Sequence, residues 1–173
     1  MNRGRIQRGL LVGLFVVAAI AGVIALEIAT SGSEERTRPA PKLPSQVLQG
    51  PRVTLAALHG TPALINFWAS WCDPCREEAP ELERFSRSLH GRAELVGVDW
   101  NDRTDNALAF IHEFGLTYPI LRDGSQEVGT DYGLNGLPTT FILDAQGRIV
   151  QTLQGPQTTA TLQAALEEAS SGD

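Results

Sequence analysis

The first apolar stretch of the chain predicts a membrane anchor. Residues 9–26 carry no charge and are mostly apolar over eighteen positions, which is near the shortest length that crosses a bilayer as a helix. Arg3, Arg5 and Arg8 precede this run, and the next basic residue is Arg36. Because positive residues stay on the cytoplasmic side, we expect the rest of the chain to lie outside the cytoplasm.

A cleaved signal peptide is the alternative interpretation of this segment. The apolar run is long for one, and no clear A-x-A site closes it. We therefore expect residues 1–27 to form a cytoplasmic stub and transmembrane signal anchor. Residues 28–44, rich in Ser, Gly, Pro and charge, are expected to form a flexible tether, and residues 45–173 a single folded domain.

Within that domain, strand-like and helix-like patterns alternate. The expected strands are residues 53–55, 63–68, 94–100, 139–143 and 148–153. The expected helices are residues 74–89, 104–114 and 158–169, with a short extended piece at 118–121 and a helical turn at 127–132. The run at 63–68 is continuously apolar, as in a buried central strand. Crossover helices between strands predict an α/β domain whose mixed central sheet is flanked by helices.

The chemistry-bearing feature is the pair of cysteines, the only two of the chain. Cys72 and Cys75 are separated by Asp73 and Pro74, where the helix 74–89 is predicted to start. There the first thiol meets unpaired N–H groups and the positive end of the helix dipole, which stabilise its thiolate. The second thiol lies on the adjacent turn and can close a disulfide. The pattern indicates thiol–disulfide redox chemistry.

Three other roles are open to the cysteine pair. A structural disulfide over so short a loop would contribute little chain entropy. A zinc site would need four ligands, and His59, His90 and His112 are scattered along the sequence. An inert buried pair is the third possibility.

Charge narrows the class of partner. The net charge is −6, and the part from Ser45 onward holds eight basic and seventeen acidic residues. An acidic domain without a basic stripe argues against nucleic acid.

Two segments resemble the hallmarks of the thioredoxin-like superfamily. Residues 66–75 (NFWASWCDPC) are similar to its active-site segment, and residues 136–144 (GLPTTFILD) to its cis-proline loop and following strand. Over residues 48–166 the chain resembles the membrane-anchored TlpA/ResA/CcmG (DsbE) group of thiol–disulfide reductases. The resemblance implies a thioredoxin-like fold, here preceded by one N-terminal transmembrane helix.

The resemblance also implies roles for individual residues. Cys72 would attack a partner disulfide, and Cys75 would resolve the mixed disulfide. Pro74 would shape the turn, and Trp71 would form an apolar rim, although a core position for this tryptophan is the alternative. Asp73 disfavours the Cys72 thiolate, so we predict a reducing potential.

Two further parts of the site are implied in the same way. Pro138 would be the cis-proline facing the dithiol, with Leu137 offering backbone groups to a bound peptide. Glu78, three residues after Cys75, would exchange protons with a thiol, although it also fits a solvated acidic face. Asn66 stands where general thioredoxins carry a buried Asp, which leaves Glu78 as the proton handler.

Function and partners follow from the resemblance. It implies an extracytoplasmic protein-disulfide reductase in cytochrome c maturation, because the segment at 97–110 looks most like the CcmG branch. The client would be the CxxCH motif of apocytochrome c, and the electron donor a transmembrane thiol carrier of the CcdA or DsbD type. No cofactor or metal is expected, because the dithiol is the redox group. A general disulfide reductase, a copper metallochaperone for cytochrome oxidase and a thiol peroxidase are the alternatives.

Overall fold

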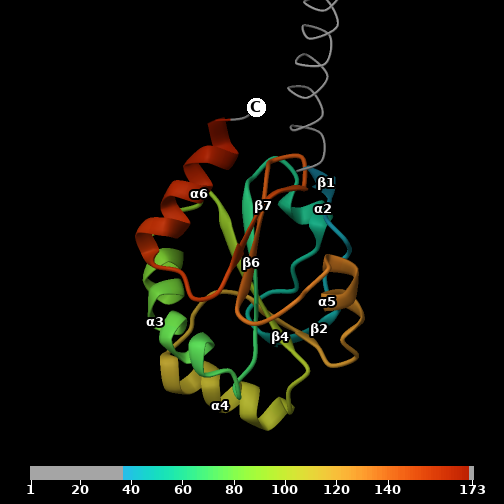
Figure 1. The fold of residues 1–173 in the computed structure, drawn as a ribbon, viewed down its shortest axis with the longest axis vertical. Helices are drawn as coiled ribbons and strands as arrows, with labels where there is room; N and C mark the ends of the chain where they lie inside the picture. The colour runs from blue at the N-terminus through green and yellow to red at the C-terminus, as the bar shows by residue number, and fades with distance from the viewer. Residues whose placement is uncertain (1–36, 172–173) are drawn as a thin grey trace, which may run out of the picture. The chain divides into compact units, whose positions relative to one another are not determined.

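The computed structural model describes residues 37–171 of the chain (Figure 1). The expected anchor, residues 1–27, and residues 28–36 of the expected tether lie outside this part. Within residues 37–171, no helix combines the length and apolar character that crossing a membrane requires.

The described residues form an α/β fold with one mixed sheet. The strands are β1 (Arg38–Pro39), β2 (Gln46–Gln49), β3 (Ala63–Trp68), β4 (Glu94–Trp100), β5 (Ile120–Asp123), β6 (Thr139–Leu143) and β7 (Arg148–Gln154). The helices are α2 (Leu55–Leu58), α3 (Asp73–Ser88), α4 (Thr104–Phe114), α5 (Glu127–Tyr132) and α6 (Thr159–Ser171).

The order of strands in the sheet is β1-β7-β6-β3-β4-β5-β2. β3, β4 and β5 run parallel, whereas β6 is antiparallel to β3 and β7 is antiparallel to β6. Trp68 pairs with Asp99 of β4, and Phe67 pairs with Thr139 of β6. This register brings the end of β3, the end of β4 and the start of β6 to one edge of the sheet, where the segment holding both cysteines begins.

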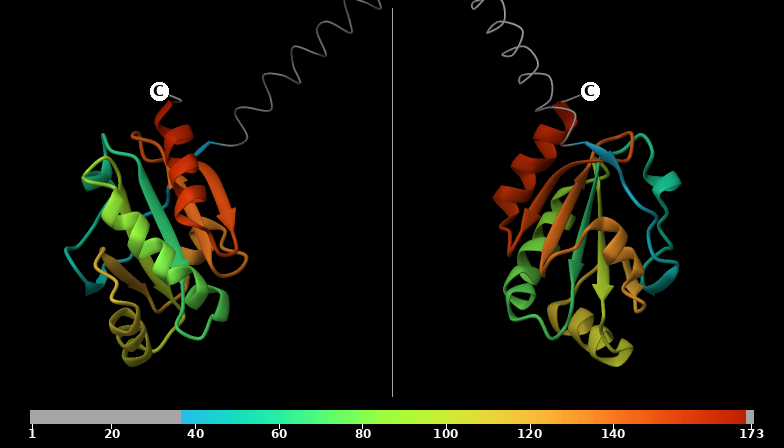
Figure 2. Two further views of the ribbon diagram at one scale, coloured as in Figure 1. Left: turned by 90° about the vertical axis from the view of Figure 1, so that its left-hand side faces the viewer. Right: turned by 45° about the vertical axis from the view of Figure 1, so that its right-hand side comes forward.

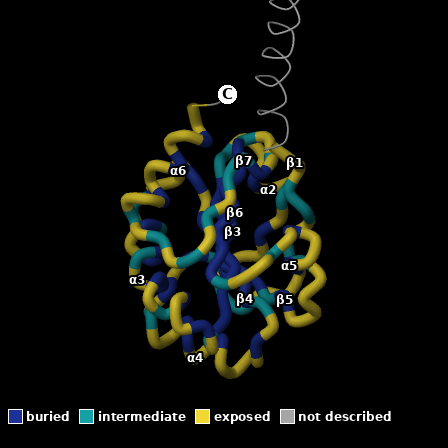
Figure 3. The backbone as a smooth tube through the Cα atoms, viewed as in Figure 1, coloured by how far each residue is buried: buried dark blue, intermediate teal, exposed yellow. Residues whose placement is uncertain are grey.

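Two layers of helices enclose the sheet (Figure 2). α3, α4 and α6 pack on one face with Leu64, Trp68 and other apolar side chains of the strands. Leu58 of α2 and Tyr132 of α5 pack on the other face. Every residue of β3 is buried, which places this strand at the centre of the core (Figure 3).

Most of the expected elements are confirmed, and residues 53–55 are a clear exception. They were expected to form a strand, but Leu55 begins the short helix α2. Thr54 is its N-cap, with its side-chain oxygen accepting a hydrogen bond from the Ala57 N–H at 3.3 Å. A capping threonine satisfies a free helical N–H, and this local bond outweighs the strand-like alternation of the segment.

The start of the folded domain also differs from the expected boundary at residue 45. Arg38 and Pro39 pair with Ile149 and Arg148 of β7. The guanidinium of Arg38 donates a hydrogen bond to the Tyr132 carbonyl. Residues 38–44 therefore belong to the domain and not to a tether.

Candidate active site

The two cysteines lie at the N-terminus of α3 and form a disulfide. The S–S bond is 2.04 Å long and the Cα atoms are 5.3 Å apart. Cys72 is the N-cap of α3, and its sulfur accepts a hydrogen bond from the Cys75 N–H at 3.2 Å. The same N–H that caps this sulfur would stabilise a Cys72 thiolate after reduction. The two cysteines thus lie at the start of the helix that the sequence pattern predicts.

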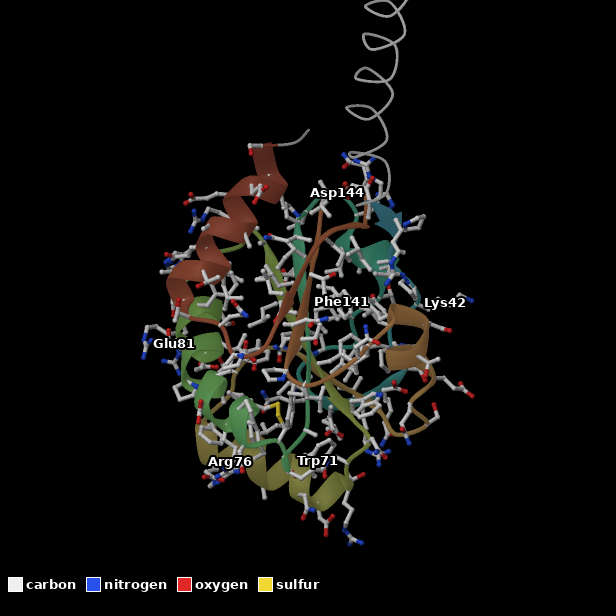
Figure 4. All side chains as sticks on the ribbon, viewed as in Figure 1. Lys42, Trp71, Arg76, Glu81, Phe141 and Asp144 are labelled. Carbon is white, nitrogen blue, oxygen red and sulfur yellow. A yellow bond between two sulfur atoms is a disulfide. The ribbon has the colours of Figure 1, made fainter. Side chains whose placement is uncertain are left out.

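Trp71 lies at the surface beside this disulfide. Its side chain is among the few large apolar ones that are exposed, at 56%, whereas Cys72 and Cys75 are 5% and 2% exposed. The Trp71 indole N–H donates to the Asn101 carbonyl at 3.2 Å, which holds the ring at the end of β4 (Figure 4). The alternative of a core tryptophan is therefore wrong, and the exposed ring forms a rim beside largely enclosed sulfurs.

Asp73 and Pro74 occupy the first two positions of α3 and are both exposed. Proline at this point gives up an N–H that has no partner within a helix in any case. The carboxylate of Asp73 meets the positive end of the helix dipole. The two residues between the cysteines therefore fit the helix start as well as the chemistry.

The loop before β6 lies at the same edge of the sheet. The Leu137–Pro138 peptide bond is cis, as predicted. Its surroundings are fixed by two hydrogen bonds, from the Thr139 hydroxyl to the Gly136 carbonyl at 2.8 Å and from the Gly155 N–H to the Pro138 carbonyl at 2.9 Å. Leu137 is half-buried and packs against the apolar cluster that contains both cysteines.

Glu78 is a buried carboxyl on the dithiol helix, at 1% exposure. Its Oε2 accepts a hydrogen bond from Asn66 Nδ2 at 3.0 Å, and its Oε1 accepts one from the Gln157 N–H at 3.0 Å. Burial raises the pKa of Glu78 to about 7, against the opposing effect of these two bonds. A group with such a pKa accepts and releases protons near neutral pH. Because Glu78 follows Cys75 by three residues, the two side chains share one face of α3.

Asp99 and Asp102, at and just after the end of β4, are buried acids that the sequence pattern does not predict. Asp102 Oδ2 accepts a hydrogen bond from the Ser70 N–H at 2.7 Å, which ties the segment before the dithiol to the end of β4. Asp99 is fully enclosed, and burial, together with the nearby charge of Asp102, raises its pKa to about 7. The sequence feature that could have indicated the burial of Asp99 is its place near the end of the largely apolar strand β4.

The three histidines, which were candidate metal ligands, form no metal site with the cysteines in the part of the chain that the structure describes. His59, His90 and His112 are all exposed. Among residues 37–171, no group of three or more His, Cys, Asp or Glu side chains is arranged to hold a metal ion.

Relatives with similar sequences are thiol–disulfide proteins. The thiol:disulfide interchange protein HelX of Rhodobacter capsulatus is 37% identical over 135 residues, which cover 78% of this chain and 73% of HelX. The thiol-disulfide oxidoreductase ResA of Bacillus thuringiensis is 33% identical over 123 residues, which cover 70% of each chain.

Solved structures and the family assignment agree with these relatives. The crystal structure of a thiol:disulfide interchange protein of the thioredoxin family from Chlorobium tepidum matches with a TM-score of 0.70 and 26% identity, covering 78% of this chain and 97% of that one. The AhpC/TSA family matches residues 37–152. The chain therefore belongs to the AhpC/TSA family, among the thiol–disulfide oxidoreductases of the TlpA/ResA/CcmG type.

Proposed function

We propose that this protein is an extracytoplasmic reductase of protein disulfides that acts through Cys72 and Cys75. The observation that carries the proposal is the disulfide at the N-terminus of α3, on the same helix as the buried carboxyl of Glu78. This arrangement combines a stabilised thiolate, a second thiol within bonding distance and a proton acceptor.

The reaction has two exchange steps. The Cys72 thiolate of the reduced protein attacks a disulfide of the client, forming a mixed disulfide and releasing one client sulfur as a thiolate, which takes a proton from water. Cys75 then loses its proton to the Glu78 carboxylate and attacks the Cys72 sulfur. The Cys72–Cys75 bond forms, and the second client sulfur leaves as a thiolate that is protonated in turn. The client gains two electrons, and the protein is left oxidised.

Client binding uses the exposed groups around the sulfurs. Trp71 offers an apolar surface of 56% exposure beside Cys72. Leu137, next to the cis bond, offers its backbone to an extended peptide. Asp73 and Pro74 shape the turn between the two cysteines, and Asp73 keeps the dithiol reducing.

The cellular setting rests on the N-terminal sequence and the family. Residues 1–27 would anchor the protein in the cell membrane, with residues 28–36 as the tether and the dithiol outside the cytoplasm. The client would be apocytochrome c, reduced at its CxxCH cysteines. A transmembrane thiol carrier of the CcdA or DsbD type would return electrons to Cys72 and Cys75. The interchange activity named for HelX supports the reaction class.

Trapping the mixed disulfide tests the proposal. In Cys75→Ser the second step is blocked, so the client should stay bound to Cys72 in cells and be released by dithiothreitol. Cys72→Ser is the matched control and should trap nothing. Recovery of apocytochrome c supports the narrow client, and recovery of many unrelated proteins supports a general reductase. A protein that traps no client, or one with a potential as positive as about −120 mV, the value for DsbA, contradicts the proposal.

The two other functions make different predictions for the same purified protein. A thiol peroxidase consumes hydrogen peroxide in a manner that depends on Cys72. A copper metallochaperone binds Cu(I) tightly through the reduced thiols, which are soft ligands. We expect neither peroxide turnover at a useful rate nor Cu(I) binding that outcompetes a strong chelator.

A further inference from the structure

Asn66 lies at the centre of the sheet and contacts Glu78 directly. It is fully buried in β3 and pairs with Thr140 across the antiparallel strand β6. Its Nδ2 donates one hydrogen bond to Glu78 Oε2 at 3.0 Å and one to Thr140 Oγ1 at 2.9 Å. Both hydrogens of the amide are therefore used, and Thr140 fixes the direction of the one that points to Glu78.

This arrangement presents Glu78 with a donor only. The amide oxygen of Asn66 has no hydrogen-bond partner among residues 37–171, so it is the amide nitrogen alone that reaches Glu78. A donor stabilises the carboxylate, whereas the protonated acid would need an acceptor at the same oxygen. Asn66 therefore favours the form of Glu78 that can take a proton.

Among residues 37–171, no other side chain hydrogen-bonds Glu78. The second partner is the backbone N–H of Gln157, and no Lys, Arg or His forms an ion pair with Glu78 in this part of the chain. Asn66 is thus the one side chain of this part of the structure that stabilises the Glu78 carboxylate through a hydrogen bond.

The other titratable groups around Glu78 do not compete for this role. Burial, together with the charge of Glu78, raises the pKa of Tyr118 above its usual range, so Tyr118 stays protonated. Glu81 is bound to Thr159 and Arg84, and Glu83 to Thr117 and Arg87. On the dithiol face of α3, Cys75 is the group that the proposed mechanism pairs with Glu78.

We propose that Asn66 is a positioning residue that keeps Glu78 a proton acceptor and so sets the pH range in which Cys75 resolves the mixed disulfide. The inference rests on the proposed reductase mechanism, in which Glu78 takes the proton of Cys75. Asn66 itself touches neither client nor sulfur in this mechanism and acts through Glu78.

The first test measures the ionisation of Glu78. Carboxyl carbon NMR of the oxidised, glutamate-labelled protein gives its titration, with the resonance assigned by its loss in Glu78→Gln. Asn66→Leu removes the donor and should raise the midpoint by about one pKa unit. Asn66→Asp should raise it further, because two adjacent carboxyls share one proton. Asn106→Leu makes the same change at an exposed position of α4 and should leave the midpoint unchanged.

The second test follows the chemistry. Reduced protein is reacted with an aromatic disulfide reagent, and the release of the second aromatic thiol from Cys72 is followed against pH. The midpoint of this rate profile should rise in Asn66→Leu by the same amount as the titration of Glu78. Thr140→Val keeps Asn66 but removes its anchor, and should give a smaller rise in both; it also provides the reading if Asn66→Leu does not fold.

The outcomes separate the two proposals. A Glu78 midpoint that is the same in wild type, Asn66→Asp and Thr140→Val overturns the role of Asn66, whether or not the protein is a reductase. A midpoint that moves while the release profile matches that of Glu78→Gln in every variant supports the Asn66–Glu78 link and overturns the proton transfer from Cys75.

Discussion

At the scale of single residues, two of the buried carboxyls have raised pKa values. Glu78 and Asp99 are 1% and 0% exposed, and burial raises the pKa of each to about 7. Glu78 accepts hydrogen bonds from two N–H groups, whereas the carboxyl oxygens of Asp99 have no hydrogen-bond partner among residues 37–171, and Asp99 Oδ2 lies 3.6 Å from the Arg122 Nε. At pH values between the unfolded and the folded pKa, each of these acids stays protonated in the folded protein but is ionised in the unfolded chain.

This leads to a pH dependence of stability with a definite sign. The unfolded Glu78 ionises near pH 4.5 and the folded one near 7. As pH rises between these values, only the unfolded state loses its proton, so the free energy of unfolding of the oxidised protein should fall by on the order of 3 kcal/mol from this residue. The fall should end above pH 7, where both states are ionised.

Urea unfolding of Glu78→Gln at pH 4.5, 6 and 8 checks this expectation. The variant should lose about half of the pH dependence and leave the part due to Asp99. Glu77→Gln changes an exposed neighbour on the same helix and should keep the wild-type dependence. A Glu78→Gln variant that keeps the full pH dependence of the wild type would contradict a raised pKa at Glu78.

The sequence indicated which residues carry the chemistry but not which acids are buried. Short motifs contain Cys72, Cys75 and Pro138, and the few residues of each motif are enough to predict their roles. Glu78 sits among other glutamates on α3, and only the packing of β3 and the Gln157 loop against that helix distinguishes it. Long-range contacts of this kind leave no pattern in the neighbouring residues.

At the scale of elements, α5 packs closely against the end of β4. A Cβ at Gly129 would lie 2.4 Å from the Trp100 indole nitrogen, which is buried. The Gly129 N–H also donates to Asp123 at 2.8 Å. The ring of Trp100 is 6.5 Å from that of Trp71, so this contact supports the rim beside the dithiol.

Gly129→Ala should therefore destabilise the protein by about 1–3 kcal/mol, as overpacking does, although alanine is the better helix former by about 1 kcal/mol. Denaturant unfolding measures the change. Gly136→Ala is the control, because a Cβ there meets nothing within 4 Å, and it should cost much less. A more stable Gly129→Ala would mean that Trp100 moves aside freely.

The long elements were predictable, and so were the short α5 and β6, whereas β1, β2 and α2 were not. The apolar run of β3 and the helical spacing of α4 depend on the segment alone, and both appear where they were expected. β1 and β2 have two and four residues. They exist because β7 and β5 offer unpaired edges to them, and a sequence pattern does not show which edge a distant segment will meet.

At the scale of the whole domain, β1 and the dithiol lie at opposite ends of the sheet. Arg38 pairs with Ile149 at the start of β7, whereas Gln154 at its end pairs with Thr139, next to Pro138. In Figure 4, Asp144 and Trp71 mark these two ends. Arg38 and Pro39 therefore contribute to stability from the end of the sheet that is away from the dithiol.

A chain that starts at Ser45 should be less stable than one that starts at Thr37 by about 2 kcal/mol, because it lacks the charged hydrogen bond of Arg38 and the pairing of β1. Denaturant unfolding of the two chains measures this difference. The alkylation rate of Cys72 after reduction should be the same in both. Equal free energies of unfolding for the two chains would mean that residues 38–44 act as a tether and not as part of the domain.

The position of β1 has a practical consequence for handling the protein. A bead, a chip or a fused carrier joined upstream of Thr37 meets the domain at the end of the sheet that is remote from Trp71. Immobilisation through that side leaves the dithiol end of the domain accessible to protein clients, whereas coupling near Trp71 would block it.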